Sequence, residues 1–298
     1  MISKIILSFV LASNFLIGSV GYNGKVLGVN NQEKGDKVEI NGPIRIANNN
    51  LGVKIEASHA LVVDIESGEI LFAKNADKQN SIASITKLMT ALVFLDTNPD
   101  LESEITIKVD DLAGAGNTTL LLGERVKLKD LLHLSLVASD NNATLAMVRA
   151  TGMKREEFVR KMNIKAIGLG FEKTNFSDPV GLNAHNVSTP IEIYELLKLA
   201  RKHAMINKIL TMDRYSFTSV SDKYHSVQAT DKLLDSYLNI LGGKTGYIEE
   251  AGFCFASAIK LNNGHEIISV VLGSIQPDGR FQDTKALADW VENNYIWK

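Results

Sequence analysis

The sequence predicts an α+β domain in which one antiparallel sheet is built from both ends of the chain around a helical insertion. Two strand-like runs lie early in the domain, three lie late, and helical periodicity dominates the residues between them. Early and late strands share a sheet only if the two ends of the domain come together, and helices then cover both faces of that sheet. A chain of 298 residues is long enough to bury a substantial core in such a domain.

The early strands are His59–Ile65 and Glu69–Ala73, which flank the turn Glu66-Ser67-Gly68. Both runs are rich in apolar residues, and a Gly-containing turn between such runs is a hairpin signal. We therefore expect the folded domain to begin near Ala57.

The middle of the chain shows apolar residues at helical spacing. A capping-box pattern, Thr189-Pro190-Ile191-Glu192, places proline at the first helical position and predicts a helix to about His203. The other predicted helices span residues 84–95, 129–138, 142–150 and 153–167.

The last third of the chain returns to strands. Runs at residues 243–248, 252–261 and 266–275 are predicted strands, and Asn262-Asn263-Gly264 joins the last two as a hairpin. Residues 281–295 form a predicted closing helix.

Composition excludes several classes of protein. The formal charge is −2 and no run of Lys or Arg occurs, so we expect no nucleic-acid partner. The only cysteine is Cys254, which excludes an intrachain disulfide and a Cys-rich metal site. It lies in an apolar run, so we expect a small buried core residue there.

The N-terminus predicts export. A basic start ending at Lys4 precedes a mostly apolar stretch over residues 5–20, which is typical of a signal peptide. An uncleaved anchor is the alternative, although a spanning helix needs about 20 apolar residues. Residues 21–56, rich in Gly, Asn and Lys, are predicted to be a flexible tether with at most one strand, followed by the domain at 57–298. We expect an extracytoplasmic protein, secreted or N-terminally anchored, whose membrane contact is made only through this N-terminal segment.

Ser84-Ile85-Thr86-Lys87 is the first motif whose residue types suit catalysis. Residues three apart on a helix share a face, so Lys87 can take the proton that a serine nucleophile must lose. A lysine serves as this base only when burial and nearby positive charge lower its pKa. The same spacing at Ser257 and Lys260 falls in a predicted strand, where the two side chains point to opposite faces.

Two further motifs are ambiguous when taken alone. Ser139-Asp140-Asn141 lies between two predicted helices, and each of its residues favours a helix N-cap. Lys244-Thr245-Gly246 opens a predicted strand after a Gly-rich turn, and its lysine is consistent with a solvated side chain in that turn. As a binding motif, it offers a cation, a hydroxyl for an anion, and a glycine that allows close approach of a ligand backbone.

Together and in this order, the three motifs resemble the S-x-x-K, S-D-N and K-T-G set of penicillin-binding proteins and class A β-lactamases. The resemblance is to the D-alanyl-D-alanine carboxypeptidase family of low-molecular-mass penicillin-binding proteins, and it covers roughly residues 57–298. Segments 83–91, 178–182, 230–234, 242–247 and 251–254 also resemble that family. The resemblance implies a β-lactamase/transpeptidase-like fold.

The resemblance also implies the catalytic roles. Ser84 is expected to attack the carbonyl between two D-alanines, with neutral Lys87 as its base. Ser139 is expected to relay a proton to the leaving nitrogen, while Lys244 keeps Lys87 deprotonated. Asn141 is expected to hold a substrate amide and the Lys87 side chain.

The implied binding roles fall on the late strand and the residues after it. The backbone N–H groups of Ser84 and Tyr247 are expected to bind the oxyanion. Thr245 is expected to bind the terminal carboxylate together with Arg280, and Gly246 to admit the ligand backbone. The expected partners are peptidoglycan stem peptides ending in D-Ala-D-Ala and β-lactam antibiotics, with no metal and no cofactor.

Several functions remain open on this sequence. A serine-type D-Ala-D-Ala carboxypeptidase, inhibited by penicillin, is the first. A DD-endopeptidase that cleaves peptide crosslinks and a non-catalytic penicillin or peptidoglycan sensor are alternatives. A class A β-lactamase is disfavoured. Fast deacylation in that class is associated with a glutamate–asparagine pair at the spacing E-x-x-x-N, and this spacing occurs nowhere in the chain.

Overall fold

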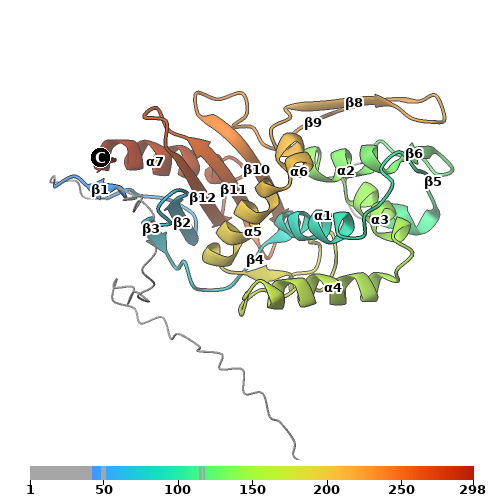
Figure 1. Cartoon of the computed structure of the whole chain (residues 1–298), viewed down its shortest axis with the longest axis horizontal. Helices are drawn as coiled ribbons and strands as arrows, with labels where there is room; N and C mark the ends of the chain where they lie inside the picture. The colour runs from blue at the N-terminus through green and yellow to red at the C-terminus, as the bar shows by residue number, and fades with distance from the viewer. Residues whose placement is uncertain (1–41, 48–51, 114–115, 117) are drawn as a thin grey trace, which may run out of the picture. The chain divides into compact units, whose positions relative to one another are not determined.

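The computed structural model describes residues 42–47, 52–113, 116 and 118–298, which all belong to one compact unit starting at Ile40 (Figure 1). The predicted signal segment at residues 1–20 and most of the predicted tether lie outside the described residues. Within the described residues, no helix is both long enough and apolar enough to cross a membrane.

The central sheet joins the two ends of the domain, as predicted. Its five strands are antiparallel and run in the order β10-β11-β12-β2-β3. The late strand β12 pairs with the early strand β2, so the helical insertion lies in sequence between two groups of strands that share one sheet. The strand bounds are Asn239–Ile248 for β10, Gly252–Lys260 for β11, Glu266–Ser274 for β12, His59–Asp64 for β2 and Ile70–Lys74 for β3.

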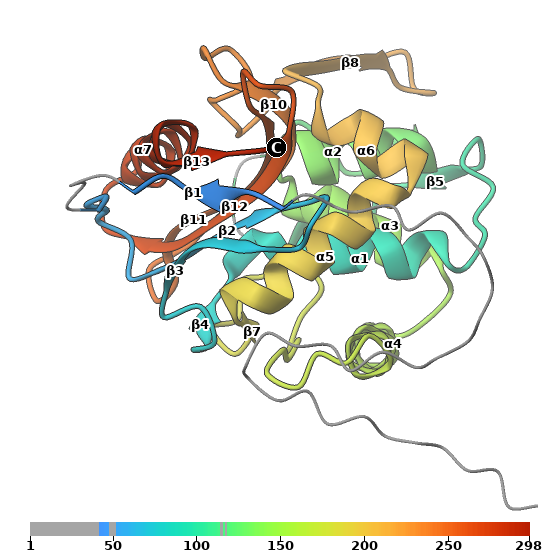
Figure 2. The same cartoon turned by 60° about the vertical axis from the view of Figure 1, so that its left-hand side comes forward.

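Helices cover both faces of this sheet, which confirms the prediction. Alternate side chains of a strand point to opposite faces, and β2 divides its residues between two hydrophobic clusters. Leu61 and Val63 belong to the larger cluster, with α5 (Pro190–Lys202). Ala60 and Val62 belong to the smaller cluster, with α7 (Gly279–Asn294), and Figure 2 shows these two helices on either side of the sheet.

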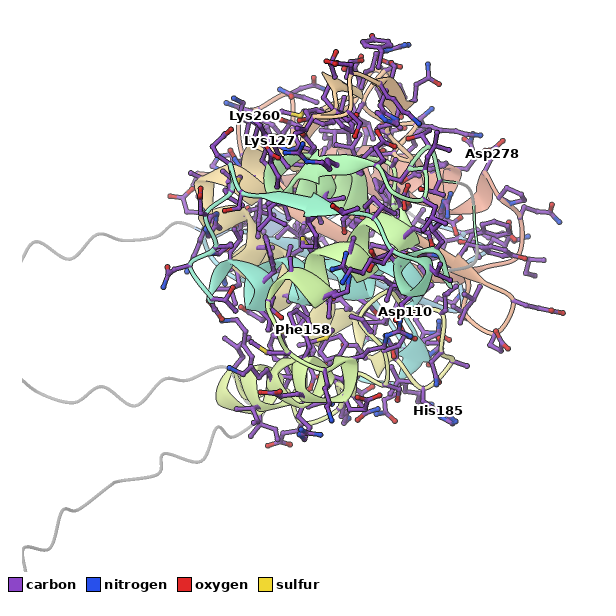
Figure 3. All side chains as sticks on the ribbon, turned by 90° about the vertical axis from the view of Figure 1, so that its right-hand side faces the viewer. Asp110, Lys127, Phe158, His185, Lys260 and Asp278 are labelled. Carbon is purple, nitrogen blue, oxygen red and sulfur yellow. The ribbon has the colours of Figure 1, made fainter. Side chains whose placement is uncertain are left out.

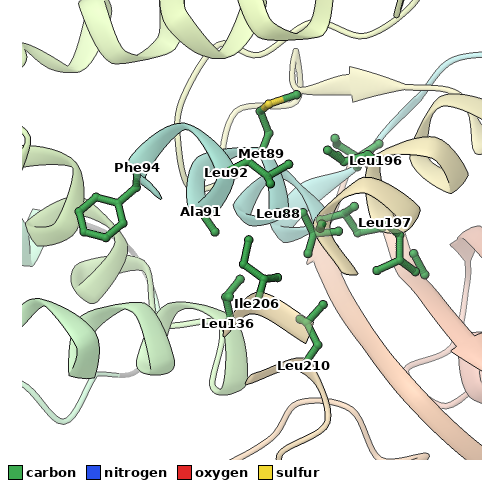
Figure 4. Packing of buried hydrophobic residues seen from close by; sticks show 14 of the residues in the cluster. Leu88, Met89, Ala91, Leu92, Phe94, Leu136, Leu196, Leu197, Ile206 and Leu210 are labelled. Atoms are coloured by element: carbon green, nitrogen blue, oxygen red, sulfur yellow. The ribbon is translucent and has the colours of Figure 1, made fainter. Parts of the chain in front are cut away.

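The helical insertion is organised around α1 (Lys87–Leu95), which is buried on all sides except at its last residue. Figure 4 shows its apolar side chains packed among those of α5, α6 and the end of α2, and buried Phe158 extends from α4 toward the same core (Figure 3). Such a helix is stabilised by packing more than by intrinsic propensity. The other helices are α2 (Leu128–Val137), α3 (Asn141–Ala150), α4 (Arg155–Gly168) and α6 (Ala204–Leu210).

The start of α5 follows the predicted capping pattern in part. Thr189 Oγ1 accepts a hydrogen bond from the Glu192 backbone N at 3.2 Å, and Pro190 occupies the first helical position. The Glu192 carboxylate does not return the bond. It accepts instead from the Lys173 backbone N at 2.9 Å and from Thr174 Oγ1 at 2.5 Å, so it ties the preceding loop to the helix.

Several short elements were not predicted. The hairpin of β8 (Arg214–Thr218) and β9 (Tyr224–Gln228) is the longest of them. The others are α6, the 3₁₀ turn η2 (Val109–Ala113), and the two-stranded pairs of β5 (Glu104–Thr106) with β6 (Arg125–Lys127) and β4 (Asn80–Ser81) with β7 (Val187–Ser188).

Part of the segment assigned to the tether packs on the domain. Ile44–Arg45 forms β1, which pairs with β13 (Tyr295–Ile296) beyond α7. Val53 and Ile55 pack against the smaller hydrophobic cluster. The ordered structure therefore begins upstream of Ala57, and the division into leader, tether and domain otherwise stays a prediction.

Candidate active site

Ser84 lies on a short 3₁₀ turn, η1 (Ala83–Thr86), which leads directly into α1. The sequence pattern predicts Ser84 at the start of the α-helix itself, and the structure instead begins α1 at Lys87. Ala83 has a φ of 46°, a left-handed value that costs energy in a non-glycine residue and often marks a functional site. The turn is packed tightly from outside, because a Cβ added at Gly181 would lie only 2.0 Å from the Ala83 carbonyl oxygen.

Lys87 is one turn beyond Ser84, and its amine is completely enclosed. Its Nζ lies 2.7 Å from each of three oxygens, namely Ser84 Oγ, Asn141 Oδ1 and the Val180 carbonyl. The last two oxygens can only accept hydrogen bonds. A neutral amine that donates to both of them keeps its lone pair for the Ser84 hydroxyl, which is the orientation that a base requires.

The electrostatics favour this neutral form. Burial lowers the pKa of Lys87 from 10.5 to about 7, against the charges of Asp178 and Asp140, which raise it. Burial is also the main cause of the lowered pKa of Lys244, followed by repulsion from Lys87 and Arg280. The sequence predicts that burial and Lys244 both lower the pKa of Lys87. In the structure burial lowers it, while repulsion between the two lysines lowers the pKa of Lys244. The effect of Lys244 on Lys87 stays a prediction.

The Ser139-Asp140-Asn141 motif divides its roles between structure and site. Asp140 is the N-cap of α3, where its Oδ1 accepts from the Ala143 backbone N at 2.9 Å. Its other oxygen accepts from Thr118 Oγ1 at 2.7 Å. Ser139 has a φ of 58°, a second strained position. The capping alternative is therefore correct for Asp140, while the flanking Ser139 and Asn141 turn their side chains toward the two lysines.

Lys244 connects the strand β10 to this turn. Its side chain is buried, and its Nζ donates to Ser139 Oγ at 2.8 Å and to the Thr245 carbonyl at 3.1 Å. This contact excludes the solvated-lysine alternative. It also links the two groups of residues, which we call the helical side (Ser84, Lys87, Ser139, Asn141) and the strand side (Lys244, Thr245, Gly246, Tyr247, Arg280).

Gly246 brings the strand close to the nucleophile turn. A Cβ at this position would lie 2.8 Å from the Ile82 carbonyl oxygen and 3.0 Å from the Ser84 backbone N. Only glycine allows this approach without movement of the backbone. Because β10 is the terminal strand of the sheet, no described strand pairs with its outer edge, and the backbone groups there are available to a ligand.

Arg280 lies in the first turn of α7, which begins two residues before the predicted start of the closing helix at residue 281. The helix follows β12, which β11 separates from β10, the strand of Lys244. The guanidinium donates from Nη1 to the Gly246 carbonyl at 3.0 Å and lies over the rings of Phe253 and Phe281. Arg280 therefore reaches the strand side and braces it.

Tyr247 extends the strand side outward. Its side chain is 52% exposed, and its ring stacks on Phe253 with a centroid separation of 4.1 Å. Phe253 is thus covered by Tyr247 and contacted by Arg280, which fixes the aromatic surface next to Gly246.

Some contributors to the site were not assigned a role from the sequence. The Val180 carbonyl contacts the amine of Lys87, and its loop is held by Asp178, whose Oδ1 accepts from the backbone N of Val180 and of Gly181 at 2.6 Å each. The signal available was the segment 178–182, which was noted only as a likeness. Thr230 was likewise unassigned, and its Oγ1 lies 2.5 Å from Thr245 Oγ1.

This fold and this site can be compared with known proteins. A family model described as D-alanyl-D-alanine carboxypeptidase, peptidase family S11, matches residues 45–276. A D-alanyl-D-alanine endopeptidase of Pseudomonas aeruginosa is 30% identical over 247 residues, which is 82% of this chain and 79% of the relative. A D-alanyl-D-alanine carboxypeptidase of Bacillus subtilis, DacF, is 30% identical over 247 residues, which is 80% of this chain and 63% of the relative.

Solved structures agree with this result. The Streptomyces K15 DD-transpeptidase is similar with a TM-score of 0.76 and 27% identity, covering 80% of this chain and 98% of that one. The fold and the matched family together define a serine peptidase. The chain belongs to the D-alanyl-D-alanine carboxypeptidase family, peptidase S11, as the sequence analysis inferred.

Proposed function

We propose that the protein is a serine-type D-Ala-D-Ala carboxypeptidase that acts on peptidoglycan stem peptides through an acyl-enzyme on Ser84. The observation that carries this proposal is the position of the Lys87 amine at 2.7 Å from Ser84 Oγ, with its other contacts made to two pure acceptors. Such a pair is the arrangement of an activated serine nucleophile.

The reaction then follows from the residues of the two sides. Ser84 Oγ attacks the carbonyl between the two D-alanines as its proton passes to neutral Lys87. The backbone N–H groups of Ser84 and Tyr247 bind the oxyanion, which preorganised donors stabilise strongly. Ser139, hydrogen-bonded to Lys244, relays a proton to the nitrogen of the leaving D-alanine. Water then hydrolyses the ester, and Ser84 recovers its proton.

Substrate binding is assigned to the strand side. The terminal carboxylate lies against Thr245 and the cations Lys244 and Arg280, while the peptide runs along the outer edge of β10. Asn141 holds a substrate amide as well as Lys87. A β-lactam presents a similar carboxylate and a reactive amide, so penicillins are expected to acylate Ser84.

The protein is expected to act outside the cytoplasmic membrane, where peptidoglycan lies. Export by the N-terminal segment, with or without its cleavage, is part of this proposal, as is membrane contact through that segment alone. The family acts on this same polymer, which supports the extracytoplasmic location.

A second candidate is a DD-endopeptidase. It is favoured by the relatives of Pseudomonas aeruginosa and Escherichia coli, whose printed names are D-alanyl-D-alanine endopeptidase. Both activities use the same acyl-enzyme and differ in the leaving group, which is a free D-alanine in one and a crosslinked stem peptide in the other.

Incubation of the protein with purified muropeptides, followed by mass analysis of the products, tests the proposal. Loss of one D-alanine from monomeric pentapeptides is the expected result. Conversion of crosslinked dimers to monomers without loss of terminal D-alanine would replace the carboxypeptidase by the endopeptidase. Penicillin labelling without any turnover would leave only the sensor.

A further inference from the structure

Thr245 of the strand side is paired with a second threonine, Thr230, which belongs to none of the three motifs. Thr245 is only 4% exposed, and its Oγ1 lies 2.5 Å from Oγ1 of Thr230, a residue on the segment between β9 and β10. From the structure we infer that Thr230 is a positioning residue for carboxylate recognition, because it turns the single hydroxyl proton of Thr245 toward the ligand. This inference rests on the proposed function.

The number of hydroxyl protons available decides the direction of the bond between the two threonines. Each hydroxyl donates one hydrogen bond, whereas a ligand carboxylate only accepts. If Thr245 donated its proton to Thr230, it would have none left for the carboxylate. With a carboxylate bound, Thr230 must therefore be the donor within the pair, and Thr245 the donor to the ligand.

This direction also strengthens the second bond. A hydroxyl that accepts a hydrogen bond is polarised and becomes a better donor, and this effect is larger away from water. Lys244 and Arg280 favour an anion at the same place, so the hydroxyl pair supplies direction where the cations supply charge.

Thr230 is well placed for such a role, because backbone hydrogen bonds at Thr230 and at the preceding Ala229 hold its position. Its backbone N donates to the Val137 carbonyl at 3.1 Å, at the end of α2 and two residues before Ser139. The preceding Ala229 backbone N donates to the Asp213 carbonyl at 2.7 Å. The backbone at Thr230 thus contacts the end of α2, two residues before Ser139, while its side chain contacts Thr245 of the strand side.

A purely structural role, in which Thr230 only ties the two sides together, makes a different prediction. Loss of a structural tie slows every substrate. Loss of the Thr230 hydroxyl slows ligands that carry a free carboxylate more than ligands with a neutral terminus, because a hydrogen bond to a charged acceptor contributes more. Thr230→Val retains shape and the backbone bond but removes the hydroxyl, and Thr230→Ser restores the hydroxyl.

The test compares diacetyl-Lys-D-Ala-D-Ala with its C-terminal amide on wild type and both variants. For Thr230→Val we expect kcat/KM on the acid to fall about 3- to 10-fold, mainly through KM, as for one lost hydrogen bond. The fall in kcat/KM on the amide should be clearly smaller, and Thr230→Ser should recover most of the loss on the acid. Equal slowing of acid and amide, no slowing at all, or failure of the serine variant to recover would overturn the inference.

A second pair of ligands separates this inference from the proposed function. Acylation by benzylpenicillin and by its methyl ester is followed by intact mass, with no peptide turnover required. Thr230→Val should slow benzylpenicillin selectively. If the wild type labels with penicillin but cleaves no D-Ala-D-Ala peptide, the carboxypeptidase proposal fails while the acid-to-ester ratio still decides the role of Thr230. A wild type that does neither overturns both.

Discussion

The helical side and the strand side of the site hold their functional groups in different ways. On the helical side, the reactive groups are side chains locked by a buried network, with Lys87 fully enclosed among three oxygens. The strand side instead presents the backbone edge of β10 beside Lys244 and Arg280, and the approach at Gly246 depends on the absence of a side chain.

This difference separates proton transfer from recognition. In the proposed mechanism, groups of the helical side act on any acyl donor, because every acylation needs the same nucleophile and base. Groups of the strand side act according to the charge and shape of the ligand. Substitutions on the two sides should therefore give distinct kinetic signatures, and the predictions below measure that distinction.

The largest effect is expected for the nucleophile. Ser84→Ala should abolish covalent labelling by penicillin, since the proposed ester forms on Ser84 Oγ. Intact-mass spectrometry of wild type should show one addition, located at Ser84. The matched control is Ser257→Ala, which alters the serine of the second S-x-x-K spacing. A Ser84→Ala protein that still labels would remove Ser84 from the mechanism.

The next effect concerns the base. Lys87→Arg keeps a positive charge that cannot be lost, so acylation should fall by about 10²- to 10⁴-fold, the usual contribution of a general base. Lys260→Arg, an exposed lysine of the second S-x-x-K spacing, is the matched control. Circular dichroism checks that the protein still folds around the larger arginine side chain. If the Lys87→Arg protein does not fold, Lys87→Gln gives the same test, because glutamine is smaller and also cannot act as the base.

The pH profile of the wild type sharpens this point. The base works only when neutral, so the acylation rate should rise with pH through about 7, the pKa of Lys87, and level off above it. The profile should look the same with penicillin and with a peptide, because the helical side serves both. A rate that is independent of pH between 5 and 9 would exclude Lys87 as the titrating base.

A smaller and ligand-dependent effect is expected for Arg280. A charge-assisted hydrogen bond contributes roughly 1.5–3 kcal/mol, so Arg280→Ala should lower kcat/KM for release of terminal D-alanine by about 10- to 150-fold. Penicillin acylation should be less affected.

The structure adds a complication, because Arg280 also donates to the Gly246 carbonyl. Arg280→Lys separates the two roles, since it retains the charge but cannot form the same planar fork. Intermediate activity is expected for it. Wild-type activity of Arg280→Ala on a D-Ala-D-Ala peptide would remove Arg280 from the site and leave the endopeptidase and carboxypeptidase proposals equally supported.

The parts that sequence predicts well are those with a strong local pattern. The five strands of the sheet and the helix after Thr189 carry clear periodicity or caps, and their bounds differ from the predicted ones by only a few residues. The hairpin of β8 and β9 alternates in Arg214–Thr218, yet its exposed, polar residues gave no apolar run to find.

The site shows the same division. Side chains that belong to short motifs, such as Ser84 and Lys87, were found because three or fewer residues define them. The contribution of Val180 is a backbone carbonyl, which any residue possesses, and so its identity carries no signal. Thr230 contacts a residue fifteen positions away across a turn, and only the packed structure brings the two hydroxyls together.

The smallest change in activity is expected for Asp231, a buried residue next to Gly243 of β10. Its carboxyl is 7% exposed; Oδ1 accepts from the Leu233 backbone N at 2.9 Å, and Oδ2 has no partner among the described residues. A Cβ added at Gly243 would lie 2.9 Å from that second oxygen. Burial raises the pKa of Asp231 from 3.8 to about 6, against the charges of Lys244 and Arg280, which lower it.

This raised pKa links Asp231 to stability. The folded state binds a proton more readily than the unfolded state, so the favourable contribution is complete below about pH 4 and is lost as pH rises through about 6. Asp231→Asn cannot titrate. Its free energy of unfolding, relative to wild type, should therefore increase by about 2–3 kcal/mol between pH 4 and pH 7.5, the equivalent of roughly two pKa units.

Urea unfolding at several pH values measures this difference, and Asp235→Asn, an exposed aspartate nearby, is the matched control. The benzylpenicillin acylation rate of Asp231→Asn should stay close to that of wild type, because the charge acts through the protein rather than on the ligand. A stability difference that does not change with pH would show that the Asp231 carboxyl keeps its ordinary pKa. A large loss of acylation with unchanged stability would instead place Asp231 among the groups that bind the ligand, and the strand side would then extend one layer deeper than Thr245.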